Sequence, residues 1–314
     1  LVGTDDKLNP SAQMIYSAED LNWENAIMRQ GIRDEVSANF NGTNGKSDYF
    51  FSVSYLKDQG YQIKSDYDRF TARLNVNSQM NSWFKVGANM STTVTTSNQS
   101  TADGGTSFVN PFFFTRGMAP IYPVYAYDPA SPGSFLKLEN GNRRYDYGNL
   151  SGLGLSNRPV YGGRHVVAET MLNENFFKRN MLGGRTFAEI KFLKDFKFTT
   201  NVGVDITNTN SIVFGNPEIG DGAPAGRASN TFENIANYNL SQLLTYNHSF
   251  GNHNVDALIG HENYNLVSNN LDGSRSQQIL DGNYELVNFT TTTNLSSRSE
   301  EHTSELQSRQ CISY

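Results

Sequence analysis

A two-residue alternation of apolar and polar side chains runs through most of this chain. It is clearest in residues 195–209, where every second residue from Phe196 to Ile206 is Phe, Thr, Val or Ile, and the residues between them are polar or Gly. Successive side chains of a β-strand point to opposite faces, so the pattern predicts a strand with one apolar and one polar face. What covers the apolar face then decides the class of protein.

The same alternation predicts about eight strands. Their expected ranges are 31–41, 46–57, 67–78, 83–97, 170–192, 195–209, 230–249 and 253–267. Short connections at 41–45, 79–82, 193–195 and 250–252 alternate with longer ones at 58–66, 98–169, 210–229 and after 267. This order predicts an antiparallel up-and-down meander that has all its tight turns at one end and all its long loops at the other. The 98–169 connection shows no helical periodicity.

Two environments suit an apolar strand face. The strands of a soluble β-sandwich usually run about 5–6 residues. Strands of an outer-membrane barrel need roughly 9–11 residues, apolar outside and polar inside, with short periplasmic turns and long outer loops. The strand lengths and the loop asymmetry favour a transmembrane β-barrel. Aromatic residues expected near strand ends suit its interfacial girdles: Tyr49, Tyr55, Trp83, Tyr238 and Tyr246.

Composition excludes several other classes. The 314 residues carry a net charge of -6 and form no basic stripe, so no nucleic-acid partner is expected. No apolar run is long enough for a spanning helix. The single cysteine, Cys311, permits neither an internal disulfide nor a cysteine metal site. The chain begins at Leu1 without a signal segment, and we expect it to be a fragment.

Residues 22–91 contain a Trp-containing segment, a Gly-Tyr-Ser strand, a hairpin with Gly at its tip, strands with Arg and Asn, and a Trp before KVGAN. The residues of this pattern are Trp23, Gly42, Tyr49, Ser52, Tyr55, Gly60, Ser65, Arg69, Arg73, Asn75, Trp83, Gly87, Asn89 and Ser91. In this pattern the segment resembles the SusC/RagA family of TonB-linked outer-membrane proteins. The family commonly has Thr-Asp before the first Trp, where this chain has Leu21 and Asn22.

The resemblance implies a bacterial outer-membrane barrel of about 22 strands, closed by a plug and covered by a SusD-type lipoprotein. It implies import of oligosaccharides, or sometimes peptides, powered by TonB through the plug. The plug is not found in this sequence, so we expect part of the barrel only. The expected organisation is a plug-to-barrel connection at 1–30, a partial barrel at 31–297 with an extracellular loop at 98–169, and a non-native tail at 298–314.

The expectation that the tail is non-native rests on its sequence. Residues 298–310, RSEEHTSELQSRQ, resemble the translated sequence of a DNA-sequencing adapter. A charged helix is the alternative, because Glu301 and Glu305 have helical spacing.

No catalytic set stands out, so neither an enzyme nor a cofactor is predicted. His165, His248, His253 and His261 are interpreted as ordinary polar residues and not as metal ligands. The long loop is the one region with ligand-binding promise, because its aromatic rings suit the C–H faces of sugars. The candidates are Phe112, Phe113, Phe114, Tyr122, Tyr125 and Tyr127. Alternatively, these rings pack the loop against itself or against the lipoprotein.

Three functions therefore remain open. The first is the SusC/RagA-type importer. The second is a TonB-dependent receptor for an iron chelate or cobalamin, without a lipoprotein lid. The third is a surface β-sandwich adhesin.

Overall fold

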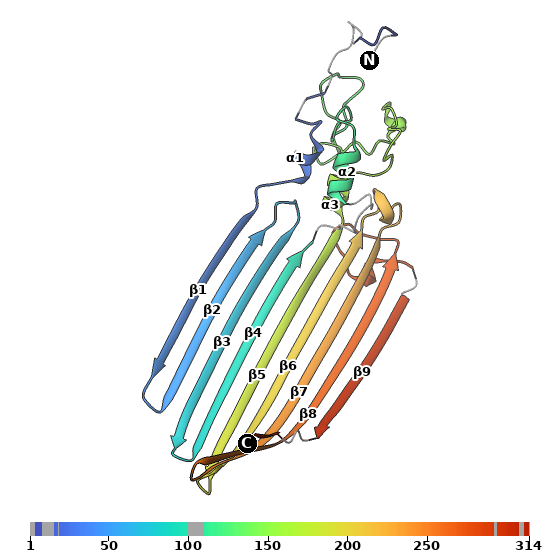
Figure 1. The fold of residues 1–314 in the computed structure, drawn as a ribbon. Helices are drawn as coiled ribbons and strands as arrows, with labels where there is room; N and C mark the ends of the chain where they lie inside the picture. The colour runs from blue at the N-terminus through green and yellow to red at the C-terminus, as the bar shows by residue number, and fades with distance from the viewer. Residues whose placement is uncertain are drawn as a thin grey trace.

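The computed structural model describes residues 4–7, 16–17, 19–99, 110–291, 294–307 and 311–313 (Figure 1). Strands dominate it, and three short α-helices and three 3₁₀ turns lie between them. The strands are β1 Ile32–Thr43, β2 Ser47–Gln59, β3 Asp66–Asn81, β4 Phe84–Asn98, β5 Glu174–Phe192, β6 Phe196–Gly215, β7 Arg227–Phe250, β8 His253–Ser276, β9 Asn294–Gln307 and β10 Cys311–Ser313. The helices are α1 Trp23–Ile27, α2 Pro111–Gly117 and α3 Val166–Leu172, with 3₁₀ turns η1 Ser151–Leu153, η2 Gly220–Gly222 and η3 Leu286–Asn288.

All strands belong to one sheet. Each strand from β1 to β8 pairs antiparallel with the next along the chain, and β8 also carries β9 and, near the tight turns, β10. No pairing joins β1 to β9 in the part of the chain that the structure describes, so the sheet is open. The predicted up-and-down barrel sheet is confirmed as a partial barrel, and no second sheet covers either face among the described residues. A β-sandwich would need one.

The two ends of the sheet differ in kind. Tight turns at 44–46, 82–83, 193–195 and 251–252 lie at one end, at the bottom of Figure 1. Connections 60–65, 99–173, 216–226 and 277–293 lie at the other end, together with α1, α2 and α3. The predicted alternation of short and long connections is confirmed. The loop prediction was incomplete, because α2 and α3 lie in or at the edge of the 98–169 connection.

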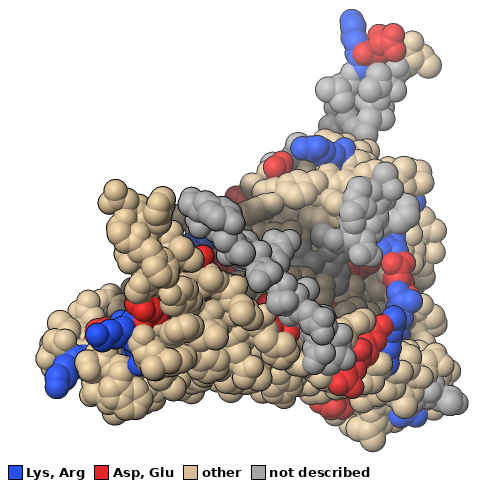
Figure 2. All heavy atoms as spheres, turned by 60° about the horizontal axis from the view of Figure 1, so that its bottom comes forward, with Lys and Arg blue, Asp and Glu red and all other residues tan. Residues whose placement is uncertain are grey.

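The register places like faces together across the strands. Leu182 pairs with Ile206, and Val202 pairs with Leu240, so the apolar residues of β5, β6 and β7 share one face. That face leaves large apolar side chains exposed, among them Leu182 at 49% and Val202 at 44%. In the space-filling view, charged side chains gather at the rim and within the hollow of the sheet, and broad uncharged surface lies outside it (Figure 2).

The apolar face forms a band and not a whole strand. On β6 it runs from Phe196 to Ile206, about 25 Å of height for a tilted strand of this length, which matches the apolar belt of a membrane barrel. Above Ile206, the next two residues of β6 on this face are polar, Asn208 and Asn210. A row of paired asparagines crosses four strands there: Asn180, Asn208, Asn234 and Asn269. Because β6 continues from there to Gly215, the loops lie at a distance from the band.

Two expectations need correction. Tyr238 lies in the middle of β7 and not near a strand end. Residues 294–307 form β9, so the helical alternative for the tail is wrong. Pairing sets Glu301 opposite Val267, which places a carboxylate on the band's face. Whether 298–314 is native stays a prediction.

The apolar band yields a test with two lysine substitutions on one strand. Val202→Lys puts a charge at mid-height of the band, where lysine on a lipid-facing strand costs about 2–4 kcal/mol. Thr199→Lys lies on the opposite, polar face near Glu189, and should change the free energy of unfolding by less than about 1 kcal/mol. Denaturant unfolding of the intact protein in lipid vesicles measures both. Equal losses for the two variants would contradict the assignment of the faces.

Candidate functional site in the loop cap and the polar face

The loops at one end of the sheet fold into a compact unit, here called the loop cap, made of residues 19–31, 110–173 and 216–226. Its apolar core joins α1, α2 and α3 and consists of Trp23, Ile27, Phe114, Met118, Val124, Val166 and Val167. The helices begin where asparagine side chains accept backbone N–H bonds, Asn22 at α1 and Asn110 at α2. The indole Nε1 of Trp23 donates to the Tyr122 carbonyl at 2.8 Å. Segments distant in sequence are thereby held together.

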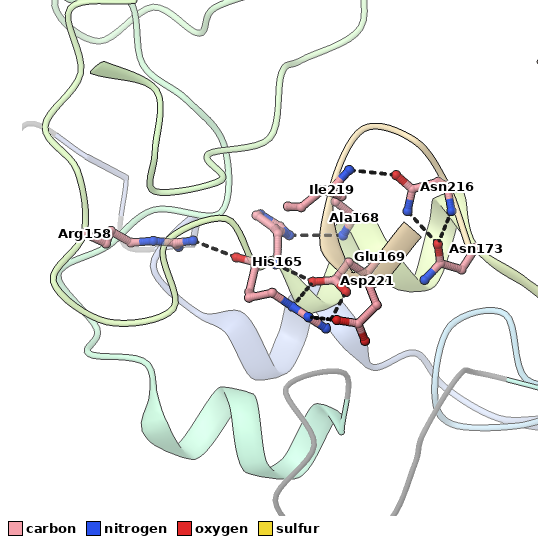
Figure 3. A network of polar contacts seen from close by, with 9 residues as sticks. Arg158, His165, Ala168, Glu169, Asn173, Asn216, Ile219 and Asp221 are labelled. Carbon is pink, nitrogen blue, oxygen red and sulfur yellow. Dashed lines mark hydrogen bonds and ion pairs between the residues drawn. The ribbon is translucent and has the colours of Figure 1, made fainter. Parts of the chain in front are cut away.

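His165 is the buried N-cap of α3. Its Nδ1 accepts from the Ala168 N–H at 3.0 Å (Figure 3). Its Nε2 lies 2.8 Å from the Val124 carbonyl oxygen. Nδ1 is therefore unprotonated and Nε2 carries the hydrogen. The ring is fully buried against Trp23 and Tyr145. Burial, together with the nearby charge of Arg158, lowers the pKa of His165 to about 3, although the Val124 bond acts in the opposite direction.

A carboxylate beneath His165 ties α3 to the 216–226 loop. Glu169 is 1% exposed and accepts two bonds from Arg164, at 3.0 and 2.8 Å. It also accepts the His165 backbone N–H, and Arg164 reaches Asp221 as well (Figure 3). Burial raises the pKa of Glu169, against the pull of these bonds. The two-point pairing with Arg164 compensates the buried charge of Glu169 and fixes the orientation of the two side chains.

Arg158 is the second buried cation of the cap. Its Nη2 donates to the carbonyls of Tyr161 and Arg164, at 3.3 and 2.8 Å, and its guanidinium lies 5.5 Å from the centre of the Trp23 ring. Burial lowers the pKa of Arg158, and Asp146 opposes that shift. Arg158 therefore holds irregular backbone in place from inside the cap.

Two ion pairs fasten the cap to the sheet. Lys64, in the β2–β3 loop, donates to the carbonyls of Met171 and Asn173 and pairs with Glu174 at 2.7 Å. Arg29 pairs with Asp66 at 2.6 Å at the start of β3. Each links a cap segment with the end of a strand, so the cap is positioned against the sheet.

The predicted ligand-binding aromatics separate into two groups. Phe114 is 0% exposed and Tyr127 is buried, so for these two the packing alternative holds and neither presents a ring face. Tyr122 and Tyr125 are partly buried against the same core. Phe113 contacts Tyr161, and Phe112 is 39% exposed. A ligand role for Phe112, Phe113, Tyr122 and Tyr125 stays a prediction.

The polar face of the sheet carries two adjoining hollows that the sequence pattern alone did not reveal. They measure about 300 and 400 Å³ and share Asn89, Arg185 and Asp205 on β4, β5 and β6. Arg185 pairs with Asp205 at 3.4 Å. The alternation places these residues on one face, but only the register, which sets Arg185 between Asn89 and Gly203, makes them neighbours.

Among the residues that the structure describes, no group of three or more His, Cys, Asp or Glu side chains is placed to hold a metal ion. His248 pairs with Asp195 at 2.9 Å near the tight turns. His261 and Glu262 are consecutive residues of β8 and therefore point to opposite faces. None of the helices in the described ranges has the length and apolar character needed to span a membrane.

Comparison with known proteins finds relatives in both sequence and fold, although no protein-family model matches the chain. The chain is 27% identical over 260 residues to TonB-dependent receptor P3 of Formosa agariphila, and 25% identical over 263 residues to TonB-dependent receptor P39 of the same organism. Each match covers 82% of this chain, but only 24% and 21% of those proteins. The chain thus spans about a quarter of their length.

Solved structures of the RagAB peptide transporter share the fold. One matches with a TM-score of 0.72 at 20% identity, over 90% of this chain and 30% of the other. The "closed-closed" state of the RagAB peptide importer matches with a TM-score of 0.62 over 91% of this chain and 30% of the other.

The two phenylalanines of α2 provide a test of the cap core. Phe114→Ala removes a fully buried ring and should lower the stability of the loop cap by about 3–5 kcal/mol. Phe112→Ala, two residues away and partly exposed, should lower it by about 1 kcal/mol or less. Hydrogen exchange of the α3 amides in the intact protein measures both. Equal protection in the two variants would mean that Phe114 does not support the cap.

His165 makes the cap sensitive to pH. The pKa of His165 in the folded cap lies below the ordinary value of about 6.5. Below pH 6.5, His165 therefore binds a proton in the unfolded cap but not in the folded cap. From pH 7 down to about 5, the free energy of cap opening should therefore fall, by up to about 1.4 kcal/mol per unit below 6.5. At lower pH the raised pKa values of Glu169 and Asp146 act in the opposite direction, since their protonation favours the folded cap.

The measurement is the exchange rate of the Ala168 amide against pH. His165→Asn keeps an N-cap acceptor without a group that titrates in this range, and should flatten the profile. A profile unchanged by that substitution would remove His165 as the cause.

Proposed function

We propose that the intact protein imports oligosaccharides or peptides across the outer membrane. The resemblance of residues 22–91 to the SusC/RagA family of TonB-linked receptors, from which the proposal starts, is confirmed. The observation that carries this proposal is the single up-and-down sheet with an outward apolar band and all long connections at one end. Such a sheet suits a membrane wall and not a soluble core.

In this proposal the tight turns face the periplasm and the loop cap faces outward, as in other outer-membrane barrels. This orientation revises one expectation. Residues 19–31 enter β1 from the loop end and pack through Trp23 into the cap core. We therefore assign them to the outer loops and not to a connection between plug and barrel.

The proposed partner is a SusD-type lipoprotein that covers the outer loops. RagAB, with which the chain shares its fold, is a peptide transporter. The exposed Phe112 lies in the cap, where it is open to a partner or to a ligand. Energy would come from TonB acting on a plug, and the plug lies outside the residues described.

Uptake in living cells tests this function. A strain without the gene should lose energy-dependent accumulation of fluorescent oligosaccharides or peptides, and the intact gene should restore it. An uncoupler of the proton gradient should abolish the restored uptake. The affinity-tagged protein should also co-purify with a surface lipoprotein. Restored uptake of an iron chelate or cobalamin, without a co-purifying lipoprotein, would instead establish the receptor that needs no lid.

A further inference from the structure

A third hollow on the polar face lies at the loop end of the sheet, away from the Arg185 hollows. It measures about 270 Å³ and lies between the ends of β6, β7 and β8 and the start of β9. Arg227 and Ser229 of β7, Ser274 of β8 and Asn294 of β9 line it. Ser229 pairs with Ser274, which pairs with Asn294, so these side chains form a row across three strands.

The hollow faces the interior of the curved sheet. Arg227 and Asn239 lie on β7 an even number of residues apart, so they point to the same face. Asn239 lines one of the polar hollows beside Arg185. Gly215 lies opposite Arg227 and contributes no side chain, which leaves the guanidinium room beside the strand.

Four side chains that line this hollow carry donors without a partner in the described residues. Arg227 forms no ion pair or hydrogen bond within the described residues, and the same holds for the side chains of Ser229, Ser274 and Asn294. No Asp or Glu lines the hollow. A guanidinium, two hydroxyls and an amide therefore converge on one small volume without a negative charge to satisfy them.

A second arginine holds the rim of the hollow. Arg275 donates to the carbonyls of Thr291 and Leu286, at 2.6 and 2.9 Å. The Thr291 hydroxyl accepts from the Ser276 N–H at 2.8 Å. These bonds fix the segment before β9 against the end of β8, so the hollow is bounded by hydrogen-bonded backbone.

Two other arginines on the polar face are paired with carboxylates. Arg185 pairs with Asp205 at 3.4 Å, and Arg33 lies 3.6 Å from both Glu35 and Asp58. Arg227 differs from both in lacking a carboxylate. A planar guanidinium suits two-point binding of a carboxylate, and neighbouring hydroxyl and amide donors add bonds to the same anion.

We propose that this hollow binds a carboxylate of the imported ligand, carried by an acidic peptide residue or by a uronic acid sugar. The proposal rests on the proposed import function. The volume admits one such unit of a larger ligand and not a whole oligomer. The position at the loop end of the polar face is where a ligand would meet the barrel wall on entering.

Binding to the intact purified protein in detergent tests the proposal, with four probes. Triglutamate and trigalacturonate carry carboxylates, and trialanine amide and maltotriose are the neutral counterparts. Calorimetry should show at least one acidic probe binding at least tenfold more tightly than its neutral counterpart. Arg227→Gln should remove that advantage, a loss of about tenfold in affinity, and Arg227→Lys should restore only part of it.

The matched control is Arg33→Gln, which removes the same charge from the same face at a site already paired with carboxylates. It should leave the affinity for acidic probes unchanged. Heat-dependent mobility on gels checks that every variant forms a barrel. Preference for triglutamate identifies a peptide ligand, and preference for trigalacturonate identifies an acidic sugar; either supports the site.

Three results would overturn the proposal: no preference for acidic probes, an Arg227→Gln variant that binds them like the original protein, or an equal loss in Arg33→Gln. The fate of the import function is read separately from uptake in cells. Acidic probes that bind through Arg227, in cells that import nothing by energy-dependent uptake, would leave the site standing and remove the import function. If cells import ligand but the affinity for acidic probes does not depend on Arg227, the import function stands and the proposed site is removed.

Discussion

The antiparallel hydrogen-bond ladder is the interaction on which the rest of this structure depends. In lipid, an unpaired backbone N–H or C=O has no water to bond, so a wall of strands must satisfy its backbone internally. The ladder does this from β1 to β8, with a register shift in β3 between Gln79 and Asn81. It also sets the register, and the register aligns the apolar residues of successive strands into one band. A slip of one residue would turn every side chain of a strand to the wrong face.

The loop cap must also satisfy its buried backbone groups, but it has no strand ladder to do so. Its backbone is mostly irregular, so buried carbonyls and N–H groups must find side-chain partners. His165, Arg158 and Glu169 supply them, which explains why charged and polar residues occupy the centre of an apolar core. The ion pairs of Lys64 and Arg29 then join the cap to the strand ends. A rigid sheet and a separately packed cap give the proposed outer surface a defined shape above the membrane.

Much of the fold was predictable from the sequence, because a two-residue period is a local signal that extends over long strands. All eight predicted strands are present, and Phe196 through Ile206 lie as the alternation required. The cap was not predictable in this way. Trp23 and Phe114 are 91 positions apart and meet only through tertiary packing. The helices α2 and α3 have seven residues each, too few for a helical period to show in the sequence.

The sequence by itself determined the strands, their two faces, the order of short and long connections, and the family resemblance, because each depends on residues close together in the chain. Only the tertiary structure decided which aromatic residues are buried and which arginines find a carboxylate. Phe112 and Phe114 look alike in sequence, and so do Arg33 and Arg227, but their surroundings differ. The physical reason is that burial and charge pairing are set by neighbours from other strands and loops. Those neighbours are selected by register and packing and not by spacing along the chain.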